Sequence, residues 1–287
     1  MNKKEVLTFV AALLAASVGA AEPDFTTLIG HRGESEDAPE NTLPAYRLAV
    51  DRGFGFECDV YLSRDGRVYT FHDPNLTRTS GGANTNKCSD VTWDEVSALD
   101  VGSWGRWKGS QFAGTRPALL EEVLRLARPG RWIYIDMKTL TGDPVPYIRD
   151  ILAGQTTANP GNVLFLAGTV ACGKELRKHL PEYKVLYCAN SRHGWKEDSP
   201  PVAVDEVLAT MREMDAAGLD IRFDRDVITA DFVKTVKDAG YEFHFWIYGR
   251  DRAEDVAEAF RNGADTVTTN CPKRMMDECR GAALSGE

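Results

Sequence analysis

The chain has 287 residues, of which 43% are hydrophobic and 27% charged, a composition typical of a globular protein with a substantial core. This length fits one large α/β barrel or two medium domains. The formal net charge is −9 and no block of lysine and arginine occurs, which argues against a nucleic-acid partner because such binding depends on basic patches.

Residues 1–20 are expected to be a signal peptide, and residues 21–287 a single domain. Two lysines precede an apolar run at Val6–Ala16, and small residues precede the expected cleavage after Ala20. The run is shorter than the roughly 20 residues that span a bilayer. We therefore expect export to the periplasm or beyond, without stable membrane insertion. A buried N-terminal helix is the alternative.

Strand-like and helix-like segments alternate along the remaining chain. Helical periodicity is clearest at Leu119–Ala127, Val204–Ala217, Phe232–Ala239 and Ala253–Asn262. This alternation predicts a parallel sheet with helical crossovers, and hence a (β/α)8-type barrel. There are nine candidate strands for the eight strands of such a barrel, so one candidate is surplus. Leu219–Phe223 is the weakest of them. The candidates are Thr27–His31, Gly55–Leu62, Arg67–Phe71, Trp132–Lys138, Asn162–Ala167, Tyr183–Cys188, Leu219–Phe223, Tyr241–Tyr248 and Asp265–Thr269.

The longest stretch without clear structure runs from Pro74 to Pro117. It contains several glycines and asparagines, among them Gly81–Gly82 and Gly102. A long loop in a compact domain often has a function, for example as a lid, and a plain surface excursion is the alternative.

The six cysteines do not form a disulfide scaffold, because they are few for this length. No CxxC pair occurs, which argues against a zinc site. Cys172 and Cys188 fall near the ends of adjacent predicted strands. We hypothesise that these two form a disulfide.

Acidic residues occur at the ends of two predicted strands. Glu57 and Asp59 are alternate residues of one strand, so both carboxylates face the same side. Two unpaired carboxylates buried there would be costly, so they need a cation. Asp136 supplies a third oxygen ligand from another strand, and this set suits Mg²⁺ or Ca²⁺. A salt-bridge cluster with Lys138 is the alternative.

Two of the five histidines, His31 and His72, end apolar strand-like runs. A single histidine at such a place is usually a structural hydrogen-bonding group. A pair beside three acids suits phosphodiester cleavage, where one group deprotonates the attacking oxygen and another protonates the leaving one. Arg32 offers a bidentate fork for the phosphate oxygens.

Together these motifs resemble the glycerophosphodiester phosphodiesterase family. The resemblance covers essentially the whole mature chain in the same order, and it implies a distorted TIM barrel of the phospholipase C-like phosphodiesterase type. The segments that carry it are His31-Arg32-Gly33, Pro39-Glu40-Asn41-Thr42, Glu57-x-Asp59, His72-Asp73-Pro74, Ile135-Asp136-Met137-Lys138, Leu119–Leu124, the strand of Trp246, Gly263-Ala264-Asp265 and Thr269-Asn270-Cys271-Pro272.

The resemblance also implies roles for individual residues. His31 and His72 match the acid and base of catalysis. The ligands of one divalent cation match Glu57, Asp59 and Asp136. The expected substrate contacts are Arg32, Asn41, Lys138 and Trp246, the last of which could hold a choline head group by cation–π attraction.

Three departures from the family pattern suggest an outlying member. The family usually has glutamate where Asp136 stands, and a side chain one methylene shorter shifts the metal or reaches it through water. The strand of Trp246 continues Ile-Tyr-Gly-Arg rather than Thr-x-Asn, and Val163–Gly168 lacks the Ser-Phe pair often seen.

The leading expectation is metal-dependent hydrolysis of small glycerophosphodiesters to sn-glycerol 3-phosphate and an alcohol. One alternative is a phospholipase D-like enzyme that acts on sphingomyelin or lysophospholipid and releases a cyclic phosphate. Another is a non-catalytic binding barrel, which would bind ligand without turnover. The sequence indicates neither the alcohol nor an oligomeric state.

Overall fold

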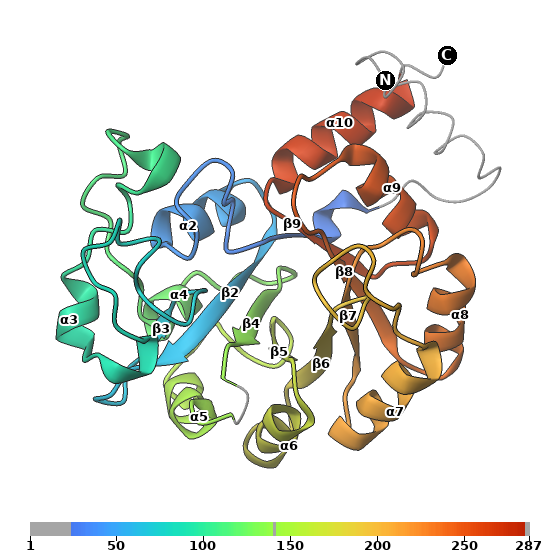
Figure 1. The fold of residues 1–287 in the computed structure, drawn as a ribbon, viewed down its shortest axis with the longest axis horizontal. Coiled ribbons are helices and arrows are strands. Elements are labelled where there is room, and N and C mark those ends of the chain that lie inside the picture. Colours follow the sequence, from blue (N-terminus) through green and yellow to red (C-terminus); the bar gives the residue numbers. More distant parts are fainter. Residues whose placement is uncertain (1–23, 140–141, 285–287) are drawn as a thin grey trace.

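A computed structural model describes residues 24–139 and 142–284 and has the predicted barrel fold (Figure 1). The strand order is β1-β9-β8-β7-β6-β5-β4-β2-β3, and β1 also pairs with β2, which closes the ring. All pairings are parallel except that between β2 and β3. The strands are β1 Leu28–Gly30, β2 Gly55–Leu62, β3 Val68–Thr70, β4 Ile133–Met137, β5 Val163–Ala167, β6 Lys184–Ala189, β7 Gly218–Arg222, β8 Glu242–Trp246 and β9 Thr266–Thr269.

Helices cover the outside of this ring, as Figure 1 shows for α5 to α8. Alternate strand residues face outward against the helices, and the others fill the barrel with a smaller cluster around Ile29, Tyr134 and Leu186. The helices are α2 Leu43–Asp51, α3 Trp93–Ser97, α4 Leu120–Leu124, α5 Val145–Ala153, α6 Val170–His179, α7 Val204–Met214, α8 Ala230–Asp238, α9 Ala253–Arg261 and α10 Pro272–Leu284.

The prediction about the surplus strand is wrong. Leu219–Phe223 corresponds to β7, a full member of the barrel, and the additional strand is Arg67–Phe71, observed as β3. A tight turn at Gly66, where φ is +80°, reverses the chain after β2. Such a short connection permits only an antiparallel neighbour, because a parallel one needs a long crossover.

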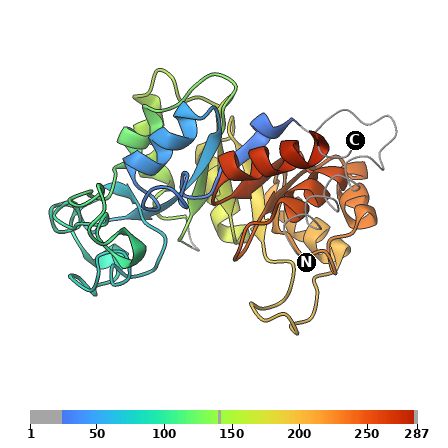
Figure 2. The same cartoon turned by 90° about the horizontal axis from the view of Figure 1, so that it is seen from above.

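Residues 74–117 form a folded lobe beside the barrel, the teal and green segment at one side of Figure 2. The short helix α3 begins with a capping box between Thr92 and Glu95. Under it lies a separate hydrophobic cluster. The stretch that lacked a clear sequence signal is therefore packed, and it joins the barrel through β3. The fully buried members of the cluster are Tyr69, Phe71, Leu76, Cys88, Val91, Val96 and Val101.

The hypothesised disulfide is wrong, since both Cys172 and Cys188 are free thiols. Cys172 lies on α6 and packs in the outer core between helices and strands. Cys188 lies on β6 and packs against the cluster inside the barrel. The sheet separates the two side chains, so they cannot meet.

The predicted signal peptide, residues 1–20, lies outside the described residues. Among the helices of residues 24–139 and 142–284, none is long and apolar enough to cross a membrane.

Candidate active site

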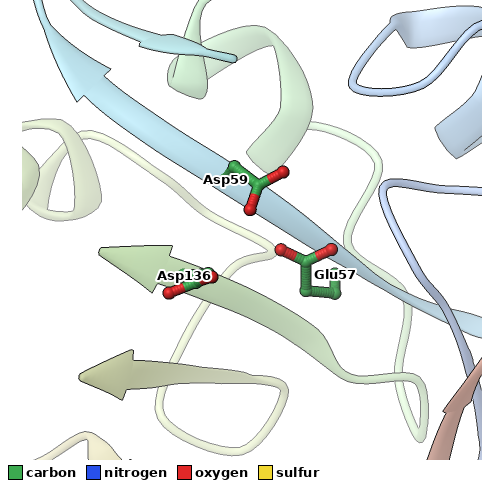
Figure 3. A group of neighbouring side chains, drawn as sticks. All are labelled: Glu57, Asp59 and Asp136. Carbon is green, nitrogen blue, oxygen red and sulfur yellow. The ribbon is translucent and has the colours of Figure 1, made fainter. Parts of the chain in front are cut away.

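Three carboxylates meet between two neighbouring strands, β2 and β4 (Figure 3). Glu57 and Asp59 both point inward from β2, and Asp136 is the register partner of Asp59 on β4. Ligand oxygens of all three lie within 4.8 Å of one another. The alternation of strand residues and the parallel pairing of β2 with β4 thus build the acidic cluster predicted from the sequence.

Two cations face this acidic cluster. The Lys138 Nζ lies 2.8 Å from Asp59 Oδ1 and 2.6 Å from Asp136 Oδ2. The Arg32 guanidinium lies 3.3 Å from Asp59 Oδ2, and the Arg32 backbone N–H donates to Glu57 Oε2 at 2.8 Å. The ion pairs of the alternative prediction and the three predicted metal ligands therefore occur at one site.

The charges of the cluster are not fully balanced. Burial, reinforced by the charges of Asp59 and Asp136, raises the pKa of Glu57 well above its ordinary value. Burial acts in the same direction on Asp59, but Lys138 and Arg32 outweigh it and hold the pKa of Asp59 well below its ordinary value. Glu57 Oε1 is buried and has no hydrogen-bond partner among the described residues. An oxygen left in this state fits a divalent cation, for which an all-carboxylate set is suited.

The backbone of the first motif is strained. Arg32 has φ +57°, a left-handed conformation that costs a non-glycine residue about 1–2 kcal/mol. The next residue is Gly33 at φ +85°, where a Cβ atom would lie 2.6 Å from the carbonyl carbon of Ala45. This sharp turn brings the N–H of Arg32 to Glu57, which ties the first motif to the acidic cluster.

His31 follows β1 and has its tautomer set by a chain of hydrogen bonds. The Asn270 Nδ2 donates to Asp251 Oδ2 at 2.9 Å, so the amide oxygen of Asn270 faces His31 Nδ1 at 2.8 Å. Nδ1 therefore carries the proton, and Nε2 is left as the proton acceptor. Burial, and next the charge of Arg32, lowers the pKa of His31 to about 3. The imidazole is accordingly neutral at physiological pH.

His72 lies in a different environment at the end of the β3 segment. Its Nδ1 lies 2.8 Å from Asp73 Oδ1, and Asp73 is also bound by Arg78 at 2.7 Å. Burial disfavours the Asp73 carboxylate. Hydrogen bonds from Arg78 and His72 outweigh this effect and hold the pKa of Asp73 well below its ordinary value. The Asp73 carboxylate can only accept a hydrogen bond, so Nδ1 donates to it, and this bond orients the His72 ring.

The expected substrate contacts are distributed unevenly. Asn41 is buried, donates from Nδ2 to Asp59 Oδ2 at 2.6 Å and accepts from the Tyr46 hydroxyl at 2.8 Å, so in this structure it positions Asp59. Arg32 and Lys138 lie against the acidic cluster. Trp246 lies across the barrel on β8, where its Nε1 donates to the Ala189 carbonyl at 3.2 Å.

A cavity of about 850 Å³ opens beside this cluster. Arg32 and Asn270 line it on the side of the acids, and Trp104 lines it from the lobe. The Arg78 guanidinium lies 4.9 Å from the Trp104 ring and binds Glu40 at 2.7 Å. The lobe thus contributes one wall of the cavity.

Sequence reasoning missed several functional candidates. Asn270 stood in a recognised motif but received no role, and Asp251, which holds Asn270 by two hydrogen bonds, carried no signal. Arg222 ends the strand judged weakest. A useful signal for both Asn270 and Arg222 was their place at a strand end, since such residues face the barrel mouth.

A parallel barrel with an acidic cluster and two oriented histidines at the carboxyl-terminal face defines the class of phosphodiesterase barrels. The Glycerophosphoryl diester phosphodiesterase family model matches residues 31–274, so the chain belongs to this family.

Individual relatives agree with this placement. A glycerophosphodiester phosphodiesterase of Caldanaerobacter subterraneus is 40% identical over 102 residues, covering 35% of this chain and 40% of that protein. One of Bacillus subtilis is 29% identical and covers 62% of this chain and 65% of that protein. The chain spans about two fifths of the length of the first curated relatives it matches.

Solved structures support the fold. A phosphodiesterase from Oleispira antarctica, in complex with the product sn-glycerol-3-phosphate, aligns with a TM-score of 0.74 at 23% identity and covers 88% of this chain and 96% of that one. A structure from Silicibacter pomeroyi aligns with a TM-score of 0.75 at 19% identity, covering 91% and 95%.

Proposed function

We propose that this chain hydrolyses small glycerophosphodiesters to sn-glycerol 3-phosphate and an alcohol, with one divalent cation, Mg²⁺ or Ca²⁺, held by Glu57, Asp59 and Asp136. The observation that carries the proposal is the pair of histidines beside this acidic cluster, each oriented by a hydrogen bond at Nδ1. The bound cation would supply positive charge against the phosphate oxygens.

We infer the proton transfers from the burial of His31 and the contact of His72 with Asp73. Neutral His31 accepts, at Nε2, the proton of the glycerol 2-hydroxyl as its oxygen attacks phosphorus. His72, supported by Asp73, donates a proton to the leaving alcohol oxygen as the P–O bond breaks. Water then opens the cyclic phosphate with the roles reversed, which returns both histidines to their starting states. Arg32 and Lys138 contact the phosphate oxygens.

The experiment is turnover of glycerophosphocholine and glycerophosphoglycerol followed by phosphorus NMR. The proposal expects sn-glycerol 3-phosphate, loss of activity in excess EDTA and recovery with Mg²⁺ or Ca²⁺. A cyclic phosphate as the only product would instead support the phospholipase D-like alternative. Tight binding without turnover at either metal would support a binding barrel. Full activity in EDTA would contradict the metal requirement.

Export after cleavage of residues 1–20 stays part of the proposal. Expression of the full chain with amino-terminal sequencing of the mature product tests it. A first residue within one position of Ala21 is expected, and a mature protein that begins at Met1 would contradict it.

A further inference from the structure

An arginine lies in the half of the barrel mouth that faces the acidic cluster. Arg222 is the last residue of β7, and its neighbours Leu219 and Ile221 pack outward in the helix-side core. Alternation therefore directs Arg222 into the barrel, as it does its register partner Trp246 on β8. The Arg222 side chain is only 9% exposed.

This buried guanidinium lacks an adequate partner. Arg222 Nη1 has no hydrogen-bond partner in the part of the chain that the structure describes. The nearest carboxylate oxygen, Asp224 Oδ2, lies 3.7 Å from Nη2 and is already bound by Arg192 at 2.7 Å. A buried charge without hydrogen bonds destabilises a fold, so its presence here indicates a ligand that completes it.

The space in front of Arg222 is a cavity of about 590 Å³. Arg250 lines this cavity and also the 850 Å³ cavity beside His31, so the two are adjacent at Arg250. Arg250 has no ion pair with any described residue. A ligand can therefore extend from the acidic cluster past Arg250 toward Arg222.

Most other charges of the smaller cavity are paired or exposed. Asp255 binds Arg252 at 2.7 Å and Arg225 at 2.5 Å. The remaining acids, Glu197 and Asp226, are exposed, and water screens them more than it does a buried group. Arg222 is thus the cavity's available buried cation, and the exposed Arg250 lies beside it.

Aromatic rings form a wall beside these cations. The Arg222 guanidinium lies 5.5 Å from the centroid of Tyr248, whose ring contacts Trp195 at 5.5 Å and Trp246 at 6.3 Å. Trp195 and Tyr248 are 64% and 62% exposed. Trp195 belongs to the β6–α7 loop, which extends away from the barrel in Figure 2.

We propose that Arg222 determines substrate specificity by binding a second anionic group, a carboxylate or phosphate, on the alcohol portion of the phosphodiester. The planar guanidinium fork matches either group with two parallel hydrogen bonds, and Arg250 adds positive charge along the path. A choline head group is disfavoured because its cation would face Arg222. The inference rests on the proposed phosphodiesterase function and narrows its substrate class.

The test compares kcat/KM for four substrates that differ only in the head group. Glycerophosphoglycolate carries a carboxylate, glycerophosphoinositol 4-phosphate a phosphate, glycerophosphoglycerol no charge and glycerophosphocholine a cation. The wild type is expected to prefer at least one anionic head group over choline by about tenfold or more, the effect of one charge-assisted pair. The two anionic substrates distinguish a carboxylate site from a phosphate site.

Arg222→Met keeps the length of the side chain and removes its charge. It is expected to reduce the anionic preference about tenfold and to leave turnover of glycerophosphoglycerol within about threefold. Arg222→Lys retains the charge without the fork and is expected to restore part of the preference. The matched control is Arg225→Met, which removes an arginine of the same cavity that is paired with Asp255 and should leave the preference unchanged.

The outcomes separate the two proposals. Hydrolysis of all four substrates with no anionic preference, or a preference that survives in Arg222→Met, overturns the specificity role and leaves the phosphodiesterase function standing. No hydrolysis of any substrate with either metal overturns the proposed function and, with it, the inference. Should both Arg222 variants fail to fold, the wild-type comparison decides: an anionic preference supports the specificity role, and its absence overturns that role.

Discussion

The two halves of the barrel mouth differ in how their charges are compensated. On the side of β1, β2 and β4, the cluster acids Asp59 and Asp136 are paired with Arg32 or Lys138, and Glu57 Oε1 has no hydrogen-bond partner among the described residues. On the side of β6, β7 and β8, the buried Arg222 has only a long contact of 3.7 Å with Asp224, and large aromatic rings are exposed. A closely paired cluster suits chemistry that is the same for every substrate. A cluster whose charges are incompletely paired suits recognition of a group that only some substrates carry.

The largest expected effect belongs to the first half. His31→Ala and His72→Ala should each lower kcat by about 10²–10⁴-fold, because each removes a proposed proton-transfer group. The loss should be similar for all head groups, which steady-state assays with the four substrates would show. His179→Ala is a matched control, since that histidine lies on α6 and pairs with Glu175 at 3.2 Å. A loss confined to one head group would break the distinction between the halves.

A smaller effect is expected at Asn270, which positions His31 without reacting. Asn270→Ala removes the acceptor at His31 Nδ1 and should lower kcat about 10–100-fold with little change in KM, the usual range for a group that orients an active residue. Asp251→Asn frees the Asn270 amide to rotate and should act in the same direction. An increase in KM with unchanged kcat would instead place Asn270 in substrate binding.

In the second half, Trp246→Phe should raise KM by about two- to tenfold, since aromatic contacts are individually modest. The change should depend on the head group, in contrast to the histidine variants. Phenylalanine keeps the packing but removes the hydrogen bond to the Ala189 carbonyl, so the thermal midpoint must be measured beside KM. An equal effect on all four substrates would contradict a place for Trp246 near the head group.

The smallest expected effect concerns stability and arises from Asp220 on β7. Burial, assisted by the charge of Asp136, raises the pKa of Asp220 from 3.8 to about 8. Between pH 3.8 and about 8, Asp220 is therefore protonated in the folded chain and ionised in the unfolded chain. Stability from this group is greatest at low pH and is lost as the pH rises toward 8.

Asp220→Asn should remove this dependence, so the variant should be more stable than the wild type at pH 8 and similar at pH 5. Urea unfolding of both proteins in EDTA at the two pH values measures the difference. A wild type whose free energy of unfolding, relative to the variant, stays constant between pH 5 and pH 8 would show that Asp220 is ionised in the fold.

Local patterns were sufficient to predict much of this protein. Alternation along one strand placed Glu57 and Asp59 on a common face, and apolar runs that end in polar residues located the active edge of the sheet. The turn at Gly66 was not recognised as a hairpin signal, so β3 was counted with the barrel strands. β7 was undervalued because Asp220 and Arg222 interrupt its apolar run, although both point into the barrel.

Only the tertiary structure decided which distant residues meet. The hydrogen bond from His31 to Asn270 joins positions 239 residues apart, and it exists because ring closure brings β1 beside β9. The incomplete pairing of Arg222 likewise depends on its surroundings, since Asp224 is bound more closely by Arg192 from the β6–α7 loop. Strand alternation is a local consequence of backbone geometry, whereas barrel closure and competition for ion-pair partners depend on the whole chain.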